Sequence, residues 1–364
     1  MTDPSVQPEY KAYARLPQEF ATRERRLTAR LEDLLAVARR VESALLREMK
    51  PAIALALKWK FDFLAKTLDS PFEMERDIEY WVEMLETLGI LGEQRWFDLT
   101  GPVAPAADVW VRTAHGFDVG WTTTTEGTRF QTSREIARER LDQIIAQIGG
   151  PEWIRRKDIL DSGCGPGRYI DLLNGLGPHR IVGLEQGPAL IEVLRGRFKD
   201  VPCVEIVHGT CEKLDFPDSS FDFVLSNGVL HHTGADLRTM LADHSRVLRP
   251  GGVMFIMLMG TGGLELALWK FLRGFLYDVS VESMLARFGS VMSPLRLQGV
   301  VDHMYGEYQE TDRPVFEQWC QDLFARIERV RGIEGLDVTP ELYPDDPFFA
   351  ARFGCGQLRY LCYK

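Results

Sequence analysis

Apolar residues recur every three or four positions along the first part of the chain, which is the period of an amphipathic helix. Glycine is scarce between Pro17 and Leu91, and Pro51 and Pro71 suit the first turns of two further helices. The pattern predicts a small helical bundle whose buried stripe consists of Leu27, Leu31, Leu34, Val37, Val41 and Leu45. The same stripe would instead serve as the seam of a homodimer if two copies paired through these N-terminal helices.

The helical period breaks over residues 92–131, where aromatic and small residues follow one another without a regular spacing. We interpret this segment as a loop, either a lid over a site or a packed connection between domains. A helix is expected to begin at Thr132, because Thr132 and Glu135 have the spacing of a capping box. These signals divide the chain into an N-terminal helical domain, residues 1–131, and a second domain, residues 132–364.

The second domain alternates short apolar runs with amphipathic runs, as parallel β-α-β units do. The predicted strands are KDILDSG, RIVGLE, CVEIVHG, FDFVLSN and GVMFIMLM, and the predicted helices are YIDLLNGL, PALIEVLRGRF and ADLRTMLADHSRVL. A largely helical insertion is expected over residues 261–336, followed by two closing strands, DVTPELY and GQLRYLCYK. The predicted fold is therefore α/β, a doubly wound and mostly parallel seven-stranded sheet with an antiparallel edge.

Composition narrows the choice of partner and compartment. The chain has 43 basic and 53 acidic side chains and a net charge of −10, and such a surface disfavours nucleic acid as a partner. Its six cysteines show no CxxC pairing, so neither a metal site nor a disulfide framework is expected, and a cytoplasmic location is the simplest setting. The N-terminus lacks the pattern of a signal peptide, and the longest apolar run, from Val253 to Leu264, is shorter than the roughly 20 residues that cross a bilayer.

The most informative segment, residues 159–168, reads ILDSGCGPGR: an apolar strand runs into a glycine-rich turn and then a helix. Glycines there permit a sharp turn and the close approach of a ligand, and the amides at the helix end favour a negative group. Glu185 ends the next strand, where a carboxylate can accept hydrogen bonds from both hydroxyls of a ribose. Residue 168 is arginine where the dinucleotide G-x-G-x-x-G form has glycine, which disfavours a nicotinamide dinucleotide.

DSGCGPG, the acidic end of the second strand, SNGVLHH after the fourth strand and LRPGG before the fifth together resemble class I S-adenosylmethionine-dependent methyltransferases. The resemblance covers roughly residues 133–260 and implies S-adenosyl-L-methionine as the cofactor. Asp161 would then orient the amino end of the cofactor, and Glu185 would hold its ribose. The cofactor-binding positions implied by the resemblance are Asp161, Gly163, Cys164, Gly165, Gly167, Glu185, Gln186, Thr210, Cys211, Glu212, Asn227 and Leu230.

The adenine side departs from the family pattern. After the third strand the family usually has an acidic residue, whereas this chain has Thr210. Recognition of the adenine would then use the Thr210 hydroxyl, the amide of Cys211 or the side chain of Glu212. The chain also lacks an Asn-Pro-Pro-Tyr sequence after the fourth strand, which argues against methylation of nucleobase amino groups.

Three histidines are the candidate catalytic groups, because imidazole titrates near neutral pH. Methyl transfer requires alignment of the nucleophile, the methyl carbon and the sulfur, and a base only when the nucleophile carries a proton. His231 and His232 follow the fourth strand, near the expected position of the methyl group, and each is either a base or structural. His303 lies in VDHMYGEY, whose polar residues either bind a polar acceptor or form an inter-helix cluster.

The predicted function is methyl transfer to a small-molecule acceptor, on oxygen, nitrogen or carbon, in a pocket capped by the insertion. A methyltransferase acting on RNA or protein would use the N-terminal arginines for docking, but glutamates alternate with these arginines, which is typical of a solvated mixed-charge face. A non-catalytic regulatory protein would keep the cofactor motif without turnover. Both alternatives stay open at the level of sequence.

Overall fold

The structure is a computed structural model in which two compact units are distinguished. One unit comprises residues 1–106, 262–284 and 343–354, and the other comprises residues 107–261, 285–342 and 355–364. The predicted boundary between residues 131 and 132 therefore falls inside the second unit. The residues described are 28–29, 31–36, 39, 50–51, 53–58, 109–122, 127–277, 279–288, 299–333, 337–344 and 349–364.

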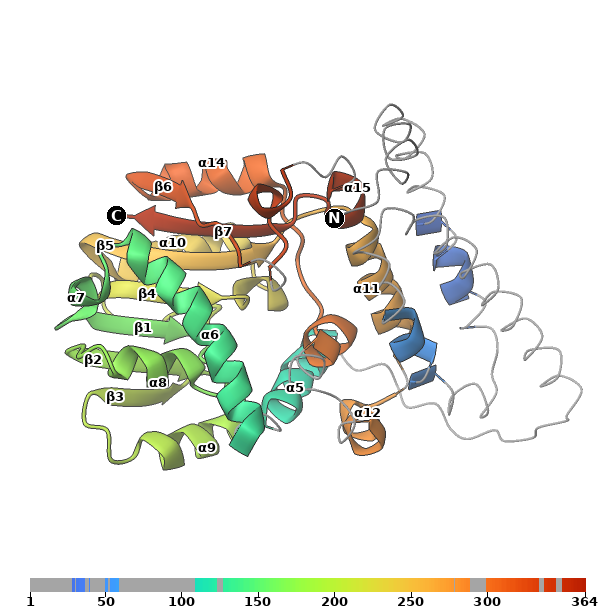
Figure 1. Ribbon diagram of the computed structural model, residues 1–364, viewed down its shortest axis with the longest axis horizontal. Coiled ribbons are helices and arrows are strands. Elements are labelled where there is room, and N and C mark those ends of the chain that lie inside the picture. The colour runs from blue at the N-terminus through green and yellow to red at the C-terminus, as the bar shows by residue number, and fades with distance from the viewer. Residues whose placement is uncertain are drawn as a thin grey trace, which may run out of the picture. The chain divides into compact units, whose positions relative to one another are not determined.

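A seven-stranded sheet forms the centre of the second unit, in the order β3-β2-β1-β4-β5-β7-β6 (Figure 1). The first five strands are parallel, and β7 runs antiparallel to both β5 and β6. The strands are β1 (Asp158–Ser162), β2 (Arg180–Glu185), β3 (Val204–His208), β4 (Phe221–Asn227), β5 (Leu248–Met259), β6 (Arg326–Arg329) and β7 (Gln357–Tyr363). The predicted doubly wound α/β fold with an antiparallel edge is confirmed.

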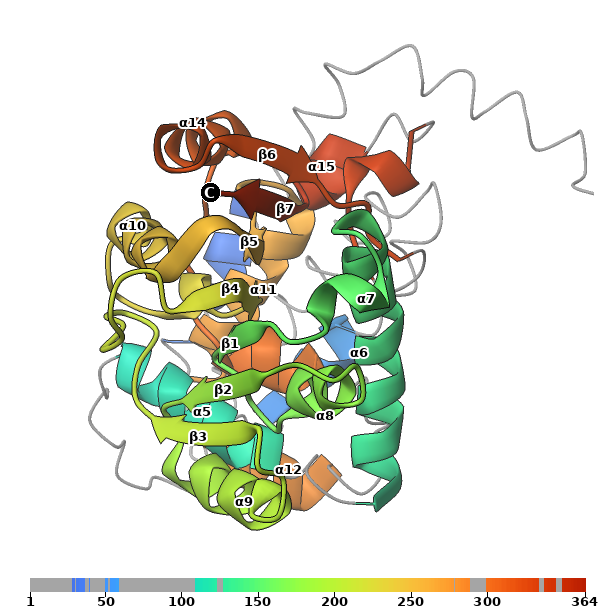
Figure 2. The same ribbon diagram turned by 90° about the vertical axis from the view of Figure 1, so that its left-hand side faces the viewer.

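Helices cover both faces of the sheet, as Figure 2 shows with α6 and α8 on one side and α10 and α14 on the other. An apolar core lies between each face of the sheet and the helices that cover it, as expected where strands are buried on both sides. The helices of this unit include α6 (Gly127–Gln147), α7 (Pro151–Ile154), α8 (Arg168–Asn174), α9 (Pro188–Phe198), α10 (Leu237–Val247) and α14 (Arg313–Leu323).

The sixth strand lies in a different place from the one predicted. DVTPELY does not form a strand: its described residues are irregular at Asp337–Thr339 and form a 3-10 turn, η4 (Pro340–Leu342). Pro340 cannot donate to a strand ladder, and the Asp337 carboxylate is bound to the side chain of Arg359. The strand is instead β6, which is short and largely polar and lies within the span predicted as a helical insertion, residues 261–336.

The prediction of a loop over residues 92–131 is wrong where the structure describes this segment, because α5 (Val109–Thr122) is a helix and α6 already begins at Gly127. Thr132 and Glu135 lie inside α6 and do not cap it. The glycines that suggested a loop serve close packing: a Cβ at Gly116 would lie 3.2 Å from Tyr305 Cβ, and one at Gly120 would overlap the side chain of Val301.

The unit that contains the N-terminus includes α11 (Leu264–Phe275) and α15 (Phe349–Phe353), and α12 (Val281–Phe288) begins in it. Leu31 and Leu34 of the predicted stripe are 2% and 1% exposed. Aromatic side chains of α11 pack in the interior, with Phe271 stacked on Phe275 at 5.4 Å between ring centroids. The rest of the stripe, which carries the homodimer prediction, lies outside the described residues together with the helix predicted at Pro71. Among the helices described, none combines the length and the apolar composition needed to span a membrane.

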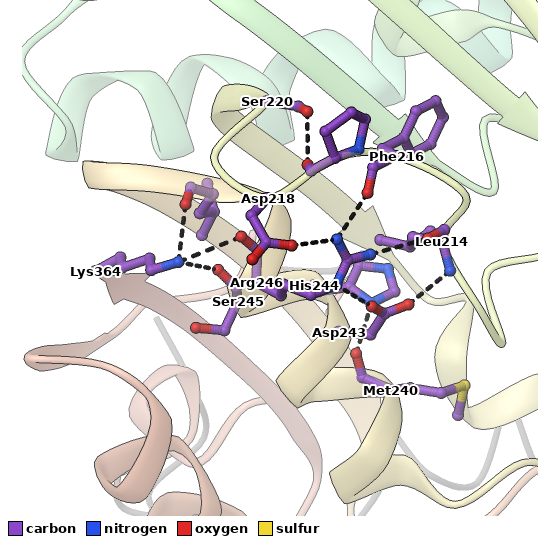
Figure 3. A network of polar contacts seen from close by, with 12 residues as sticks. Leu214, Phe216, Asp218, Ser220, Met240, Asp243, His244, Ser245, Arg246 and Lys364 are labelled. Atoms are coloured by element: carbon purple, nitrogen blue, oxygen red, sulfur yellow. Dashed lines mark hydrogen bonds and ion pairs between the residues drawn. The ribbon is translucent and has the colours of Figure 1, made fainter.

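A polar network fastens the end of α10 to neighbouring loops and to the last residue of the chain (Figure 3). The guanidinium of Arg246 donates to the backbone oxygens of Leu214 and Phe216, at 2.9 and 2.7 Å, and to the carboxylate of Asp218 at 2.8 Å. The Lys364 ammonium donates to the backbone oxygen of Ser245 at 2.7 Å. The Lys364 contact binds a carbonyl group in the last turn of α10, where the usual intrahelical donors are absent, and the Arg246 contacts hold the loop over residues 214–218 against the same helix.

His244 of α10 is a neutral, buried link between this helix and the sheet. Its Nδ1 donates to the Met240 carbonyl at 2.7 Å, so its Nε2 accepts from the Ser162 hydroxyl at 2.9 Å. Burial lowers the pKa of His244 from 6.5 to about 4, against the Met240 hydrogen bond and Asp243, which raise it.

This burial predicts a loss of stability in mild acid. Below pH 6.5 the unfolded chain binds a proton at residue 244 that the folded chain excludes, so the free energy of unfolding should fall as pH drops from 6.5 to about 4. The slope is up to ~1.4 kcal/mol per pH unit. Denaturant unfolding at pH 7 and pH 5 should show a smaller drop in His244→Gln, which does not titrate, than in the wild type. An identical drop in both proteins would contradict this role of His244.

Candidate functional site

A glycine-rich turn, residues 163–167, joins β1 to α8 at the carboxyl end of the sheet. Gly163, Gly165 and Gly167 have φ angles of 77°, 51° and 80°, which glycine adopts without steric cost. A Cβ at Gly163 would overlap Val229, and one at Gly167 would lie 2.7 Å from Leu194 Cδ2, so these two glycines are required by packing. A Cβ at Gly165 would meet no atom within 4 Å. Space for a ligand therefore opens beside Gly165.

Glu185, at the end of β2, holds this turn through backbone amides. Its Oε2 accepts from Gly165 N at 2.9 Å, and its Oε1 accepts from Gln186 N and Gly187 N at 2.9 and 2.8 Å. Burial raises the pKa of Glu185 above its ordinary value, and the three amides act in the opposite direction. An ionised carboxylate offers about four acceptor positions, so one position on Oε2 is left for a ligand hydroxyl.

Asp161 lies one strand away, on β1, and is 1% exposed. Its Oδ2 is buried and has no hydrogen-bond partner among the described residues. Burial raises the pKa of Asp161 to about 7; Arg168 lowers it, and Glu185 raises it further. A buried acceptor of this kind is costly unless a ligand donates to it.

The predicted adenine-side residues follow β3. The Thr210 hydroxyl accepts from Glu212 N at 3.1 Å and so caps its own turn. Cys211 is 6% exposed and packs in the core, whereas Glu212 is exposed. Of the three side chains, Cys211 is buried, Thr210 is half-buried and Glu212 is exposed.

After β4 the chain forms a 3-10 turn, η2 (Leu230–His232). Asn227 ends β4, next to Met257 of β5, and Cys164 of the glycine turn is 5% exposed. Leu230 is 0% exposed and packs in the same core as Met240 of α10. Its side chain thus belongs to the core, and the following histidines face a different environment.

Two of the three histidines predicted as catalytic, His231 and His232, lie together, and His303 is near enough to His231 to affect its pKa. The rings of His231 and His232 are 4.2 Å apart between centroids, and Tyr308 lies 5.5 Å from His232. Burial, followed by the nearby His232 and His303, holds the pKa of His231 well below its ordinary value. His303 belongs to a π-helical turn, η3 (Val301–Tyr305).

His232 has a defined tautomer when neutral. Its Nδ1 lies 2.7 Å from the carbonyl oxygen of Glu307, which can only accept, so Nδ1 carries the proton and Nε2 keeps a lone pair. Phe117 of α5 contacts the same ring edge to face, at 4.6 Å. A neutral His232 can therefore accept a proton only at Nε2.

Sequence reasoning missed α5, which lies at the end of the sheet toward which the parallel strands point (Figure 1). Asp118 of α5 accepts from Leu190 N at 3.0 Å and from Ala189 N at 3.3 Å, which caps the start of α9. Thr113 accepts from Glu307 N at 3.0 Å. The glycine spacing in α5 was the available signal, and it was interpreted as loop character.

The matches to known proteins fall on the same part of the chain. Residues 160–256 match the family model described as a methyltransferase domain. A probable S-adenosylmethionine-dependent methyltransferase of Mycolicibacterium smegmatis is 36% identical over 100 residues, 28% of this chain and 37% of the relative. The demethylmenaquinone methyltransferase of Listeria welshimeri is 34% identical over 99 residues, 26% of this chain and 42% of the relative. The chain thus matches less than half the length of these curated relatives.

A solved structure of Burkholderia thailandensis 1,6-didemethyltoxoflavin-N1-methyltransferase, with bound 1,6-didemethyltoxoflavin and S-adenosylhomocysteine, is 19% identical. It covers 74% of this chain and 94% of its own, with a TM-score of 0.42.

The glycine turn, the acidic end of β2 and the matched segment define a methyltransferase domain of class I. Residues 160–256 of this chain match such a domain, and the match supports S-adenosylmethionine as the cofactor. The residues present fit that cofactor, because the buried Asp161 Oδ2 lacks a donor among the described residues and the space beside Gly165 is open.

Proposed function

We propose that the protein transfers a methyl group from S-adenosylmethionine to the oxygen, nitrogen or carbon of a small-molecule acceptor. The observation that carries this proposal is the cluster of His232, Tyr308 and Phe117, in which a half-buried imidazole packs against two aromatic rings, one of them from α5. Enclosed sites with a few polar groups among apolar walls are typical of small-molecule binding. The name of the Listeria welshimeri relative, demethylmenaquinone methyltransferase, is consistent with such an acceptor.

Each group has a proposed role. The bound cofactor supplies the electrophilic methyl group. The glycine turn and Glu185 bind the ribose end, the unpartnered Asp161 Oδ2 accepts from the ammonium group, and Thr210 with Cys211 and Glu212 borders the adenine. His232 Nε2 removes the acceptor's proton when the nucleophile carries one, and His231 and His303 position the His232 ring.

The test has two stages. Calorimetric titration with S-adenosylmethionine and S-adenosylhomocysteine should show binding, and a labelled-methyl assay should then place the label in a small-metabolite fraction rather than in RNA or protein. His232→Gln should lower the turnover number about 10²- to 10⁴-fold without changing the affinity for S-adenosylhomocysteine. His179→Gln is the matched control, since the His179 side chain is 73% exposed. Label in RNA or protein alone would overturn the small-molecule proposal.

A further inference from the structure

Three arginines converge on one face of the sheet without any role in the site described so far. Arg140 comes from α6, Arg168 begins α8 and Arg359 lies on β7. Arg140 and Arg359 bind the same carboxylate, that of Asp337. Burial raises the pKa of the Tyr169 phenol, and all three guanidinium groups act against that rise. The arginines therefore form one buried cationic cluster.

The sheet register places Arg359 on the same face of the sheet as Asp161, with β4 and β5 between their two strands. Arg359 pairs with Met257, and Met257 pairs with Asn227, so their side chains project from the same face. Asp161 pairs with Leu225, two residues before Asn227, and shares that face. Arg359 thus projects on the side of the sheet that carries Asp161, near the carboxyl ends of the parallel strands.

Arg359 has more donors than the protein satisfies. Its side chain is 1% exposed, and its Nη1 is bound to the Asp337 carboxylate. Its Nε and Nη2 are buried and have no hydrogen-bond partner in the described part of the chain. Arg168 donates through Nη1 to the Ser133 hydroxyl at 2.9 Å, and its buried Nε is likewise without a partner there. Buried guanidinium donors without acceptors destabilise the folded state unless a ligand accepts from them.

The positive charge of the three arginines is also not fully balanced by nearby carboxylates. The Asp337 carboxylate is shared, because Oδ1 lies 2.6 Å from Arg140 Nη2 while Oδ2 binds Arg359. Asp302 is the second carboxylate that acts on Arg140 and Arg168. The third is Asp161, whose pKa of about 7 leaves it partly neutral at physiological pH. The cluster therefore holds three guanidinium groups and three neighbouring carboxylates, of which that of Asp161 is partly protonated.

We infer that Arg359, supported by Arg140 and Arg168, binds a carboxylate of a ligand at the cofactor edge of the sheet. The planar guanidinium suits a carboxylate because its two remaining N–H directions match the two oxygens. The carboxylate comes either from the amino-acid end of the cofactor or from an acidic acceptor. This inference rests on the proposed function and names a chemical class of ligand for the same site.

The first experiment separates the cofactor as the source. Calorimetry compares S-adenosylhomocysteine with its decarboxylated analogue on the wild type, Arg359→Met and Arg359→Lys. If the cofactor supplies the carboxylate, Arg359→Met weakens S-adenosylhomocysteine at least tenfold and leaves the analogue unchanged, with an intermediate loss for Arg359→Lys. Arg326→Met is the matched control, because the Arg326 side chain is 59% exposed on β6.

The second experiment addresses an acidic acceptor. Wild-type protein saturated with S-adenosylhomocysteine is titrated with benzoate and with benzamide. If the acceptor supplies the carboxylate, benzoate binds more tightly than benzamide, and Arg359→Met and Arg359→Lys lose this preference while keeping their affinity for S-adenosylhomocysteine. Arg359→Lys keeps the charge, so it preserves the test if Arg359→Met does not fold.

Failure of the carboxylate-site inference can be told apart from failure of the proposed function. Unchanged affinities in the first experiment together with no preference for benzoate in the second would overturn the carboxylate site and leave Arg359 as a structural partner of Asp337. A folded wild-type protein that binds no S-adenosylhomocysteine would instead overturn the proposed function, and benzoate titration of that protein would still decide the fate of the carboxylate site.

Discussion

Gly165→Leu should lose nearly all affinity for S-adenosylmethionine, by 100-fold or more, while the protein stays folded. The reason is the open space at this position, where a Cβ meets no atom within 4 Å and a leucine side chain would occupy the space left for the ligand. Because the φ of 51° is positive, a leucine at this position should lower the free energy of unfolding by about 1–2 kcal/mol. Calorimetric titration measures the affinity, and thermal unfolding measures the stability.

Gly177→Leu is the matched control for this substitution. Gly177 also has a positive φ, 73°, and a Cβ there also meets no atom within 4 Å, but it lies between α8 and β2 at the opposite end of the sheet. It should therefore show a similar loss of stability and an unchanged affinity. Equal affinities in Gly165→Leu and the wild type would remove the glycine turn from the cofactor site.

Glu185→Gln should weaken S-adenosylmethionine binding by roughly 100-fold. The carboxylate accepts from three backbone amides, and the amide nitrogen of glutamine would face donors on one side with a group that cannot accept. Loss of a charge-assisted hydrogen bond to a ligand contributes about 1.5–3 kcal/mol, and misplacement of the Gly165 turn weakens binding in the same direction. The measurement is again calorimetry with the cofactor.

Glu205→Gln provides the comparison for Glu185. Glu205 lies on β3, its side chain is 56% exposed, and its ion pair with Arg180 spans 3.7 Å at the surface. Such a pair contributes about 0–1 kcal/mol, so affinity and stability should both stay close to those of the wild type. A Glu185→Gln protein as tight as Glu205→Gln would show that the ribose is held elsewhere.

The core of the fold was predictable because its signals are local. Apolar runs such as RIVGLE and FDFVLSN become buried parallel strands, and the glycine turn after β1 lies where its motif indicates. β6 escaped prediction because RIER has only one apolar residue, and its place in the sheet depends on pairing with β7. The pairing of a short polar segment with a strand distant in sequence cannot be predicted from the hydrophobic pattern of that segment.

The same argument explains what was missed in the site. Asp161 and Glu185 follow from the motif, since strand ends that are neighbours in a parallel sheet bring their side chains together. Gly120 was ambiguous, because its reason for being glycine is Val301, far along the chain. Arg359 was invisible as a candidate because a single arginine in an apolar strand becomes informative only once its unsatisfied donors are known.

The close packing of α5 has a consequence for any attempt to redesign the acceptor. At Gly120 the helix backbone lies against the Val301 side chain with no room for a methyl group, so the helix cannot shift inward to follow a smaller molecule. In the proposed acceptor site, the side chains that can be changed are the rings of Phe117 and Tyr308. An engineer who wishes to enlarge the substrate range would trim these two rings and leave the glycines of α5 untouched.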